Sequence, residues 1–202
     1  MKVLVIGAGN MGLTYAEGMA KSSLLNHRNL MIFDKSAEVI TTLSKIDHFD
    51  VYDDIEECLP KADIVFIAVK PYHCDSLFEE IRHLVNDQQI FVSLMAGVTI
   101  YKIQEGLDVK KVVRSMPNLP AQVGKGVTSF TEAEEVSRVE LLMVRNLLDT
   151  TGLSPSTWME SVASKGGTTR AALDSMDDNN VEELIKDAAY AAFDRAVELG
   201  KE

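Results

Sequence analysis

Three glycines near the N-terminus have the spacing of a phosphate-binding turn. The sequence Gly-Ala-Gly-Asn-Met-Gly at 7–12 directly follows an apolar run. In a strand–turn–helix unit, the first glycine allows the tight turn, the second lets a pyrophosphate approach the backbone, and the third lets the helix pack on the strand. Free N–H groups and the dipole at the helix start favour an anion. A plain tight turn is the alternative. The residues expected to bind a dinucleotide here are Ile6, Gly7, Gly9, Asn10, Met11 and Gly12.

An acidic residue ends the next apolar run, Leu30–Phe33. At this place in such a unit, a carboxylate accepts hydrogen bonds from the adenosine ribose, so Asp34 is a second expected cofactor residue. A carboxylate repels a 2′-phosphate, which favours NADH. Lys35 and Ser36 follow at once and would instead serve a 2′-phosphate. The sequence leaves open both the choice between NADH and NADPH and the alternative of a solvated turn.

Further candidates follow other apolar runs, because ligands bind at the carboxyl ends of strands in open α/β sheets. Asn118 lies between two prolines that would fix its carboxamide, which then pairs with a nicotinamide or a substrate. A surface lysine, simple packing and a structural turn are the alternatives for these segments. The expected cofactor residues at these ends are Ala68, Val69, Lys70, Pro71, Ala96, Gly97 and Asn118.

A second glycine-containing loop, Ser-Lys-Gly-Gly-Thr-Thr at 164–169, offers backbone N–H donors and two hydroxyls before a helical segment. It suits a phosphate or a carboxylate, and equally a flexible linker with a helix cap. The four histidines have no metal-ligand spacing, so we predict no metal site. No residue is an obvious general acid, and we assign no catalytic side chain.

Strand and helix patterns alternate through the first three-quarters of the chain, which predicts right-handed βαβ units in a doubly wound Rossmann-type α/β sheet. After about Phe130 only helical patterns occur, so an all-helical C-terminal appendage is expected. We expect a dinucleotide-binding domain at 1–152 and a helical part at 153–202. The expected strands are Val3–Ile6, Leu30–Phe33, Phe49–Tyr52, Asp63–Val69, Ile90–Leu94 and Lys111–Met116. The expected helices are Met11–Lys21, Ile55–Leu59, Leu77–Leu84, Thr131–Leu148, Arg170–Met176 and Val181–Leu199.

Composition narrows the classes of partner. The chain has 202 residues, 46% of them hydrophobic, and a formal net charge of −11. This acidity argues against a nucleic-acid partner and against an anionic membrane surface. No apolar run is long enough to span a bilayer. Cys58 and Cys74 lie far apart, which indicates free thiols and fits a reducing cytoplasm.

Four segments together resemble the pyrroline-5-carboxylate reductase family. They follow the family's order, and the last is the most specific. Leu119 stands where the family usually has Thr, and Lys165 where it usually has Pro. The segments are Ile-Gly-Ala-Gly-Asn-Met-Gly at 6–12, Ala-Val-Lys-Pro at 68–71, Met-Pro-Asn-Leu-Pro-Ala at 116–121 with Gly-Lys-Gly at 124–126, and Ser-Lys-Gly-Gly-Thr-Thr-Arg-Ala-Ala-Leu at 164–173.

The resemblance also shows a large departure. The family has a Ser-Gly-Ser-Gly-Pro-Ala turn and long interface helices after the helix that here ends near Leu148. In this chain, Gly152 is followed at once by the segment that begins at Leu153. The junction has the form of an internal deletion, and the sequence leaves open whether it is natural, engineered or a gap in the sequence. The missing turn would supply part of the substrate pocket.

The resemblance implies a reaction. A member of this family reduces L-1-pyrroline-5-carboxylate, a cyclic imine carboxylate, to L-proline with hydride from NADPH or NADH. It implies a homodimer or a higher homo-oligomer, with Asn118 near the nicotinamide. The residues that it assigns to the substrate carboxylate are Gly166, Gly167, Thr168 and Thr169. A family member that binds the cofactor but lacks activity, through its incomplete pocket, is the alternative, and another imine or hydroxyacid dehydrogenase is a third.

Overall fold

A computed structural model describes residues 1–21, 25–117 and 128–148, together with 171, 174–175, 178–181, 183–184 and 187. The chain divides into two compact units, Met1–Gly152 and Leu153–Glu202. The assignment of cofactor binding to the first part and of a substrate and dimerisation role to the second stays a prediction. The second unit holds only the isolated described residues, so the expected helices at 170–176 and 181–199 lie largely outside the described residues.

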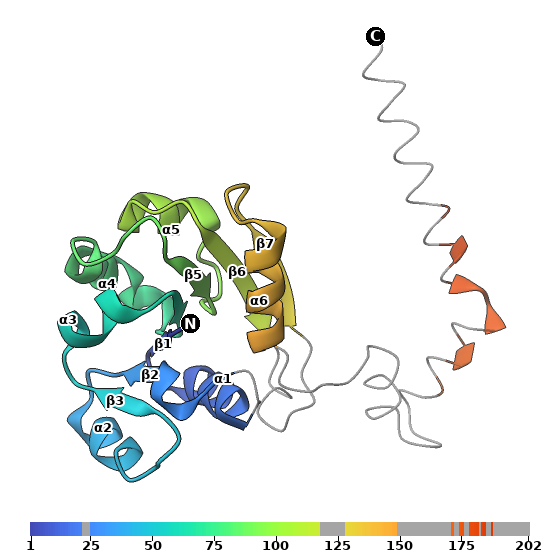
Figure 1. The fold of residues 1–202 in the computed structure, drawn as a ribbon. Coiled ribbons are helices and arrows are strands. Elements are labelled where there is room, and N and C mark those ends of the chain that lie inside the picture. The colour runs from blue at the N-terminus through green and yellow to red at the C-terminus, as the bar shows by residue number, and fades with distance from the viewer. Residues whose placement is uncertain are drawn as a thin grey trace. The chain divides into compact units, whose positions relative to one another are not determined.

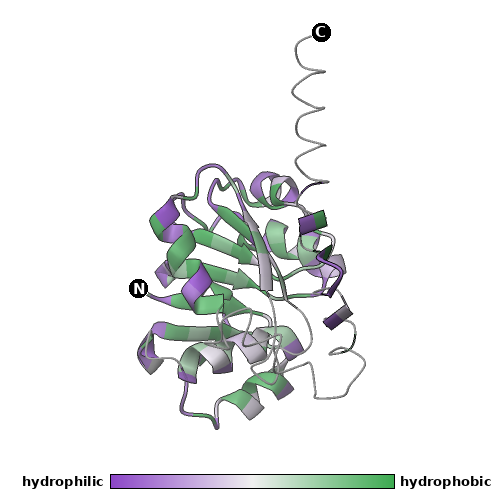
Figure 2. Cartoon of the chain, turned by 90° about the vertical axis from the view of Figure 1, so that its right-hand side faces the viewer, coloured by the Kyte–Doolittle hydropathy of each residue, from purple (hydrophilic) through white to green (hydrophobic). Residues whose placement is uncertain are grey.

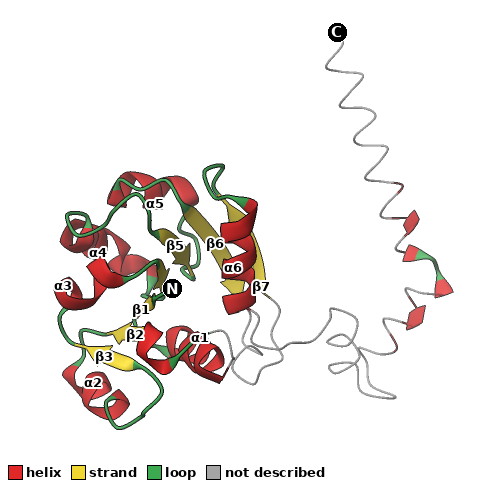
Figure 3. Ribbon diagram, in the orientation of Figure 1, coloured by secondary structure: helices red, strands yellow, loops and turns green. Residues whose placement is uncertain are grey.

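The first unit is built on one seven-stranded sheet (Figures 1 and 3). Its strands are β1 (Val3–Ile6), β2 (Leu30–Phe33), β3 (Asp50–Tyr52), β4 (Ile64–Ile67), β5 (Ile90–Ser93), β6 (Val112–Pro117) and β7 (Thr128–Glu132). Their order across the sheet is β3-β2-β1-β4-β5-β6-β7. The first six are parallel, and β7 pairs antiparallel with β6. The order reverses between β1 and β4, as in a doubly wound sheet. The predicted α/β fold class is confirmed.

Helices cover both faces of this sheet. The α-helices are α1 (Asn10–Lys21), α2 (Ala37–Leu43), α3 (Ile55–Cys58), α4 (Cys74–Ile81), α5 (Ile100–Leu107) and α6 (Arg138–Leu148). Short 3₁₀ turns lie at His27–Asn29 (η1), Leu59–Lys61 (η2) and Pro71–His73 (η3). One hydrophobic cluster joins the sheet to α1, α2 and α6, and a second joins it to α3, α4 and α5.

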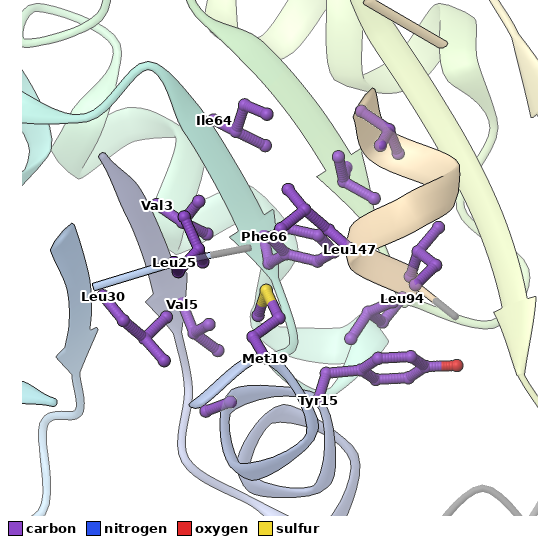
Figure 4. Packing of buried hydrophobic residues seen from close by; sticks show 14 of the residues in the cluster. Val3, Val5, Tyr15, Met19, Leu25, Leu30, Ile64, Phe66, Leu94 and Leu147 are labelled. Atoms are coloured by element: carbon purple, nitrogen blue, oxygen red, sulfur yellow. The ribbon is translucent and has the colours of Figure 1, made fainter. Parts of the chain in front are cut away.

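The strands are apolar on both sides because they lie between these two helical layers. Along β1, Val3 and Val5 enter the first cluster, whereas Leu4 and Ile6 enter the second. Hydrophobic residues accordingly concentrate on the strands and on the inner sides of the helices (Figure 2). Figure 4 shows Tyr15 of α1 among the buried residues of the first cluster. This double burial fixes the level at which β1, β2 and β4 end.

The structure corrects the expected helix Thr131–Leu148. Its first two residues belong to β7, and the helix begins at Arg138. The reason is a capping box. Ser137 Oγ accepts from the backbone N–H of Glu140 at 3.3 Å, and Glu140 Oε2 accepts from the backbone N–H of Ser137 at 2.9 Å. The expectation of helix alone beyond Phe130 is therefore wrong at its first residues.

One further helix was not predicted, and two further elements, α4 and β4, differ from their expected bounds by more than one residue. Helix α5, which the sequence interpretation did not predict, is capped by Thr99, whose hydroxyl accepts from Lys102 N–H at 3.1 Å. Helix α4 begins three residues earlier than expected, at Cys74, directly after a 3₁₀ turn that Pro71 starts. Strand β4 is shorter than the run Asp63–Val69 and ends at Ile67, which leaves Ala68–Lys70 in the loop.

Cys58 and Cys74 are both buried and free, which confirms the prediction of unpaired thiols. Burial raises the pKa of the Cys58 thiol to about 11, so this sulfur is a protonated core group. Among the residues that the structure describes, no helix is both long and apolar enough to cross a membrane.

Candidate functional site

The tight turn from β1 into α1 requires glycine at two positions. Gly7 has φ +96°, and a Cβ there would lie 3.1 Å from the carbonyl carbon and oxygen of Ala68. A Cβ on Gly12 would lie only 1.9 Å from the carbonyl oxygen of Gly7. No side chain fits at Gly12 unless the backbone moves. The helix therefore packs directly against the strand exit, as the sequence spacing predicts.

Gly9 differs from both, because a Cβ built on it meets no atom within 4 Å. Its carbonyl accepts from Leu13 N–H at 2.9 Å, so the first turn of α1 starts here. The first N–H groups of a helix have no acceptor within the helix. Open space beside a backbone that ends in free donors fits the pyrophosphate of a dinucleotide.

Asp34 fixes the shape of this turn. Its Oδ2 accepts from the backbone N–H of Ala8 at 2.8 Å, and its Oδ1 accepts from the backbone N–H of Ser36 at 2.8 Å. The backbone adds one more bond, from Gly7 N–H to the Phe33 carbonyl at 2.8 Å. The carboxylate is therefore held in one orientation at the end of β2. Its remaining lone pairs are free to accept from ribose hydroxyls.

A cleft of about 700 Å³ opens between the ends of β1, β2 and β4. It lies beside the point where the strand order reverses, which is where ligands bind in doubly wound sheets. Seven predicted cofactor residues line it: Ile6, Gly7, Gly9, Asp34, Ala68, Val69 and Lys70. The other lining residues are Phe33, Lys35, Ser36, Val39, His73, Ser76 and Leu77.

The remaining predicted residues do not line this cleft. Asn10, Met11 and Gly12 form the first turn of α1, just beyond Gly9. Pro71 starts the 3₁₀ turn after Lys70. Ala96 and Gly97 form an exposed turn after β5, in which Gly97 has φ +74°. The other five predicted residues, Asn118, Gly166, Gly167, Thr168 and Thr169, lie outside the described residues.

Lys70 lies at the exit of β4 beside two rings. Its ammonium is 5.8 Å from the centre of the Tyr72 ring, which is 71% exposed. The Tyr72 and His73 rings are 4.3 Å apart and tilted by 54°. His73 lines the cleft, so one wall combines a cation with flat surfaces. The sequence interpretation missed His73, Ser76 and Leu77, because only the packing of η3 and α4 brings them to the cleft.

The end of β5 and the neighbouring residues of β6 carry another set of polar groups. Ser93 is fully buried, and its hydroxyl accepts from Met95 N–H at 3.2 Å. Ser115 donates to the Ser93 carbonyl at 3.3 Å. Arg114 pairs with Ser93 across the sheet, and its buried Nε has no hydrogen-bond partner within the described part of the chain. A buried guanidinium donor of this kind is suited to an anion.

Tyr15 lies on α1 one turn beyond Met11 and is fully buried. Its hydroxyl shares a 2.5 Å hydrogen bond with Thr128 Oγ1 of β7. Burial raises the pKa of this phenol, and the bond to Thr128 opposes the rise. Tyr15 is therefore a neutral anchor between α1 and the sheet edge.

The searched part of the chain, which is limited to the described residues, holds no group of three His, Cys, Asp or Glu side chains placed to bind a metal ion. The polar groups that line the cleft are instead backbone donors, one carboxylate, two lysines, two serine hydroxyls and the His73 ring.

Comparison with known proteins shows which family this chain is similar to. A family model described as NADP oxidoreductase coenzyme F420-dependent matches residues 2–97, and one described as pyrroline-5-carboxylate reductase dimerisation matches residues 121–199. Pyrroline-5-carboxylate reductase from Staphylococcus saprophyticus is 26% identical over 269 positions, which cover 100% of this chain and 99% of the relative. Over its whole length, the chain is similar to pyrroline-5-carboxylate reductases.

Solved structures of this family share the fold. A pyrroline-5-carboxylate reductase from Coxiella burnetii superposes with a TM-score of 0.71 at 22% identity and covers 98% of each chain. The Plasmodium falciparum pyrroline carboxylate reductase with NADP bound superposes with a TM-score of 0.65 at 19% identity and covers 95% of each chain.

The alignment also measures the departure of this chain from its family. It spans 269 positions and includes all of a 202-residue chain, so at 67 of them only the Staphylococcus protein has a residue. Because both chains are covered almost from end to end, this shortening is internal. Its location at Gly152 stays a prediction.

Proposed function

We propose that this chain reduces L-1-pyrroline-5-carboxylate to L-proline with hydride from NADH or NADPH. The similarity to pyrroline-5-carboxylate reductases supports the substrate class and the reaction. The single structural observation that carries the proposal is the open space beside Gly9, which lines a cleft at the switch point of the sheet. A bound nicotinamide would supply the hydride to the imine carbon, and the imine nitrogen would take up a proton.

The chain's own residues bind and orient the cofactor. The Gly9 backbone and the first N–H groups of α1 are placed to bind the pyrophosphate. Asp34, fixed by two backbone N–H groups, is placed to accept from the adenosine ribose. Ala68 and Val69, which follow β4, give their side of the cleft a largely apolar surface. Such positioning brings the reacting carbons together, and orientation of this kind is worth several kcal/mol.

Contacts to the substrate are proposed from the family resemblance. We assign the backbone and hydroxyls of Gly166, Gly167, Thr168 and Thr169 to the substrate carboxylate and Asn118 to the nicotinamide region. The match to a dimerisation model over 121–199 supports a homo-oligomer, and we propose a homodimer or a larger assembly of homodimers. An acidic chain with free cysteines fits a cytoplasmic enzyme without a nucleic-acid partner.

Two measurements on the full chain test this proposal. Calorimetric titration with NADH and with NADPH measures binding, and loss of reduced-nicotinamide absorbance upon addition of the imine measures turnover. We expect saturable binding and imine-dependent oxidation that forms proline. Binding without turnover would favour the inactive family member, and absence of binding would contradict the cofactor site itself.

Gly9→Ala tests the proposed position of the pyrophosphate. The added methyl meets no protein atom, so we expect the fold to be retained. It would stand where the pyrophosphate approaches, so dinucleotide affinity should fall about tenfold or more. Unchanged affinity would place the phosphates elsewhere.

A further inference from the structure

Two clefts meet at one lysine. Beside the cofactor cleft lies a groove of about 960 Å³, and the two share Phe33 and Lys35. Apart from these two residues, Ile55 and His83, the groove is lined by carboxylates. They are Asp53, Asp54, Glu56, Glu57, Glu79 and Glu80. Lys35 therefore stands between the adenosine end of the cofactor cleft and a strongly negative surface.

The ammonium of Lys35 is already engaged. It forms an ion pair and a hydrogen bond with Glu80 Oε2 of α4, with Lys35 63% exposed and Glu80 36% exposed. The neighbouring carboxylate of Asp34 is held by the N–H groups of Ala8 and Ser36. One negative charge is thus fixed at the end of β2, and the adjacent positive charge is neutralised from α4.

We infer that Glu80 is a positioning residue that makes this chain favour NADH over NADPH, because it pairs with the lysine that would otherwise receive a 2′-phosphate. This inference rests on the proposed function, since it concerns the same cofactor cleft. The unphosphorylated ribose needs only the acceptor oxygens of Asp34. A 2′-phosphate would meet that fixed carboxylate and would have to draw Lys35 away from Glu80.

The size of the effect follows from the exposure of the pair. An exposed ion pair is weak, so its removal should change the ratio of the two dissociation constants by about three- to fivefold. The remaining preference comes from Asp34 and from the field of the acidic groove. Salt screens such fields over about 10 Å at 0.1 M, so higher ionic strength should narrow the preference further.

The experiment measures the dissociation constants of NADH and NADPH for the full chain by calorimetry, without turnover. We expect the wild type to bind NADH more tightly. Glu80→Gln should lower the ratio of the NADPH dissociation constant to the NADH dissociation constant by about three- to fivefold. Glu79→Gln is the matched control, because it removes the same charge from the same helix and the same groove but frees no lysine. It should change the ratio by less than about 1.5-fold.

A double variant isolates the pairing. In a Lys35→Met background, Glu80→Gln should no longer lower the ratio of the NADPH and NADH dissociation constants. If it narrows the ratio equally in that background, or if Glu79→Gln acts as strongly, the effect is general electrostatics and the inference is wrong. A wild type that prefers NADPH, or binds both equally, contradicts the inference but leaves the proposed function standing. Failure of both dinucleotides to bind contradicts the proposed function and the inference with it.

Discussion

The candidate site has two halves, an adenosine half at the ends of β1, β2 and β4 and a second half beside β5 and β6, and they are built differently. At the ends of β1, β2 and β4, each turn is held by hydrogen bonds between elements, such as Ala8 N–H to Asp34 and Ala68 N–H to the Ile6 carbonyl at 2.8 Å. Beside the end of β5, the buried Nε of Arg114 in β6 has no hydrogen-bond partner within the described residues, and the predicted substrate contacts lie outside those residues. The predicted adenosine contacts thus lie within short βαβ units that the structure describes, whereas most predicted contacts of the other half lie outside the described residues.

This difference reflects the order in which the chain builds the site. The adenosine half uses parallel strands buried on both faces, so their ends are fixed by the core. The predicted contacts of the second half are Asn118, which directly follows β6, and residues 166–169, which lie about 50 positions further along the chain. The internal shortening of 67 alignment positions also separates this chain from its relatives. The predictions below compare the two halves, from the largest expected effect to the smallest.

The largest effect is expected from Gly12→Ala. The new Cβ would lie 1.9 Å from the Gly7 carbonyl oxygen, so α1 must move away from β1. Overpacking against backbone should lower the free energy of unfolding by about 3 kcal/mol or more. Urea unfolding followed by circular dichroism measures this, with Gly9→Ala as control, which should stay within about 0.5 kcal/mol of wild type. Equal stability of the two variants would disprove the close contact.

Asp34→Ala tests the brace of the adenosine half. It removes the acceptor from the N–H groups of Ala8 and Ser36, and Ala8 is buried. Loss of hydrogen bonds to a charged group should cost about 2 kcal/mol. Asp53→Ala, at an exposed position after β3, is the control and should cost less than about 0.5 kcal/mol. If both variants are equally stable, Asp34 serves ligands alone and the turn is held by the backbone.

Much of the adenosine half can be predicted from sequence. β1 and β2 have the bounds that their unbroken apolar runs predict, and the glycine spacing identifies the turn between β1 and α1. Two errors of the sequence prediction, the start of α6 and the omission of α5, concern local signals. The capping box of Ser137 and Glu140 and the cap at Thr99 were present in the sequence but were not used. These errors concern boundaries and leave the site in place.

Other parts of the site depend on packing between distant elements. Val39, His73, Ser76 and Leu77 reach the cleft only because α2, η3 and α4 pack beside the strand ends. The pair of Lys35 with Glu80 joins residues 45 positions apart. No periodicity or motif encodes such a pairing, so sequence reasoning left the choice between NADH and NADPH open.

At the opposite edge of the sheet, Glu140 anchors α6 to the start of β6. Lys111 and Ser137 donate to this carboxylate, with Lys111 Nζ at 2.7 Å, and these bonds lower the pKa of Glu140 to about 2. A carboxyl whose pKa is lower in the folded state stabilises the fold above its unfolded pKa of about 4.3. That contribution is lost as the pH falls from about 4.3 towards 2.

Glu140→Gln should therefore lower the free energy of unfolding by about 1–2 kcal/mol at pH 7, and the difference from wild type should shrink as the pH falls through this window. Urea unfolding at a series of pH values measures it. Glu135→Gln, an exposed residue of the preceding turn, is the control for charge alone. A difference that stays constant with pH would show that the bond to Lys111 does not stabilise the ionised form.

The smallest effect is expected from Arg114→Met. The buried Nε has no acceptor in the described part of the chain, so its removal breaks no described hydrogen bond there. An apolar side chain of similar length replaces a buried unsatisfied donor, which is close to neutral or stabilising. The free energy of unfolding should therefore change by less than about 0.5 kcal/mol, in contrast to Asp34→Ala. A loss as large as that of Asp34→Ala would show that Arg114 already has its partner within the folded chain.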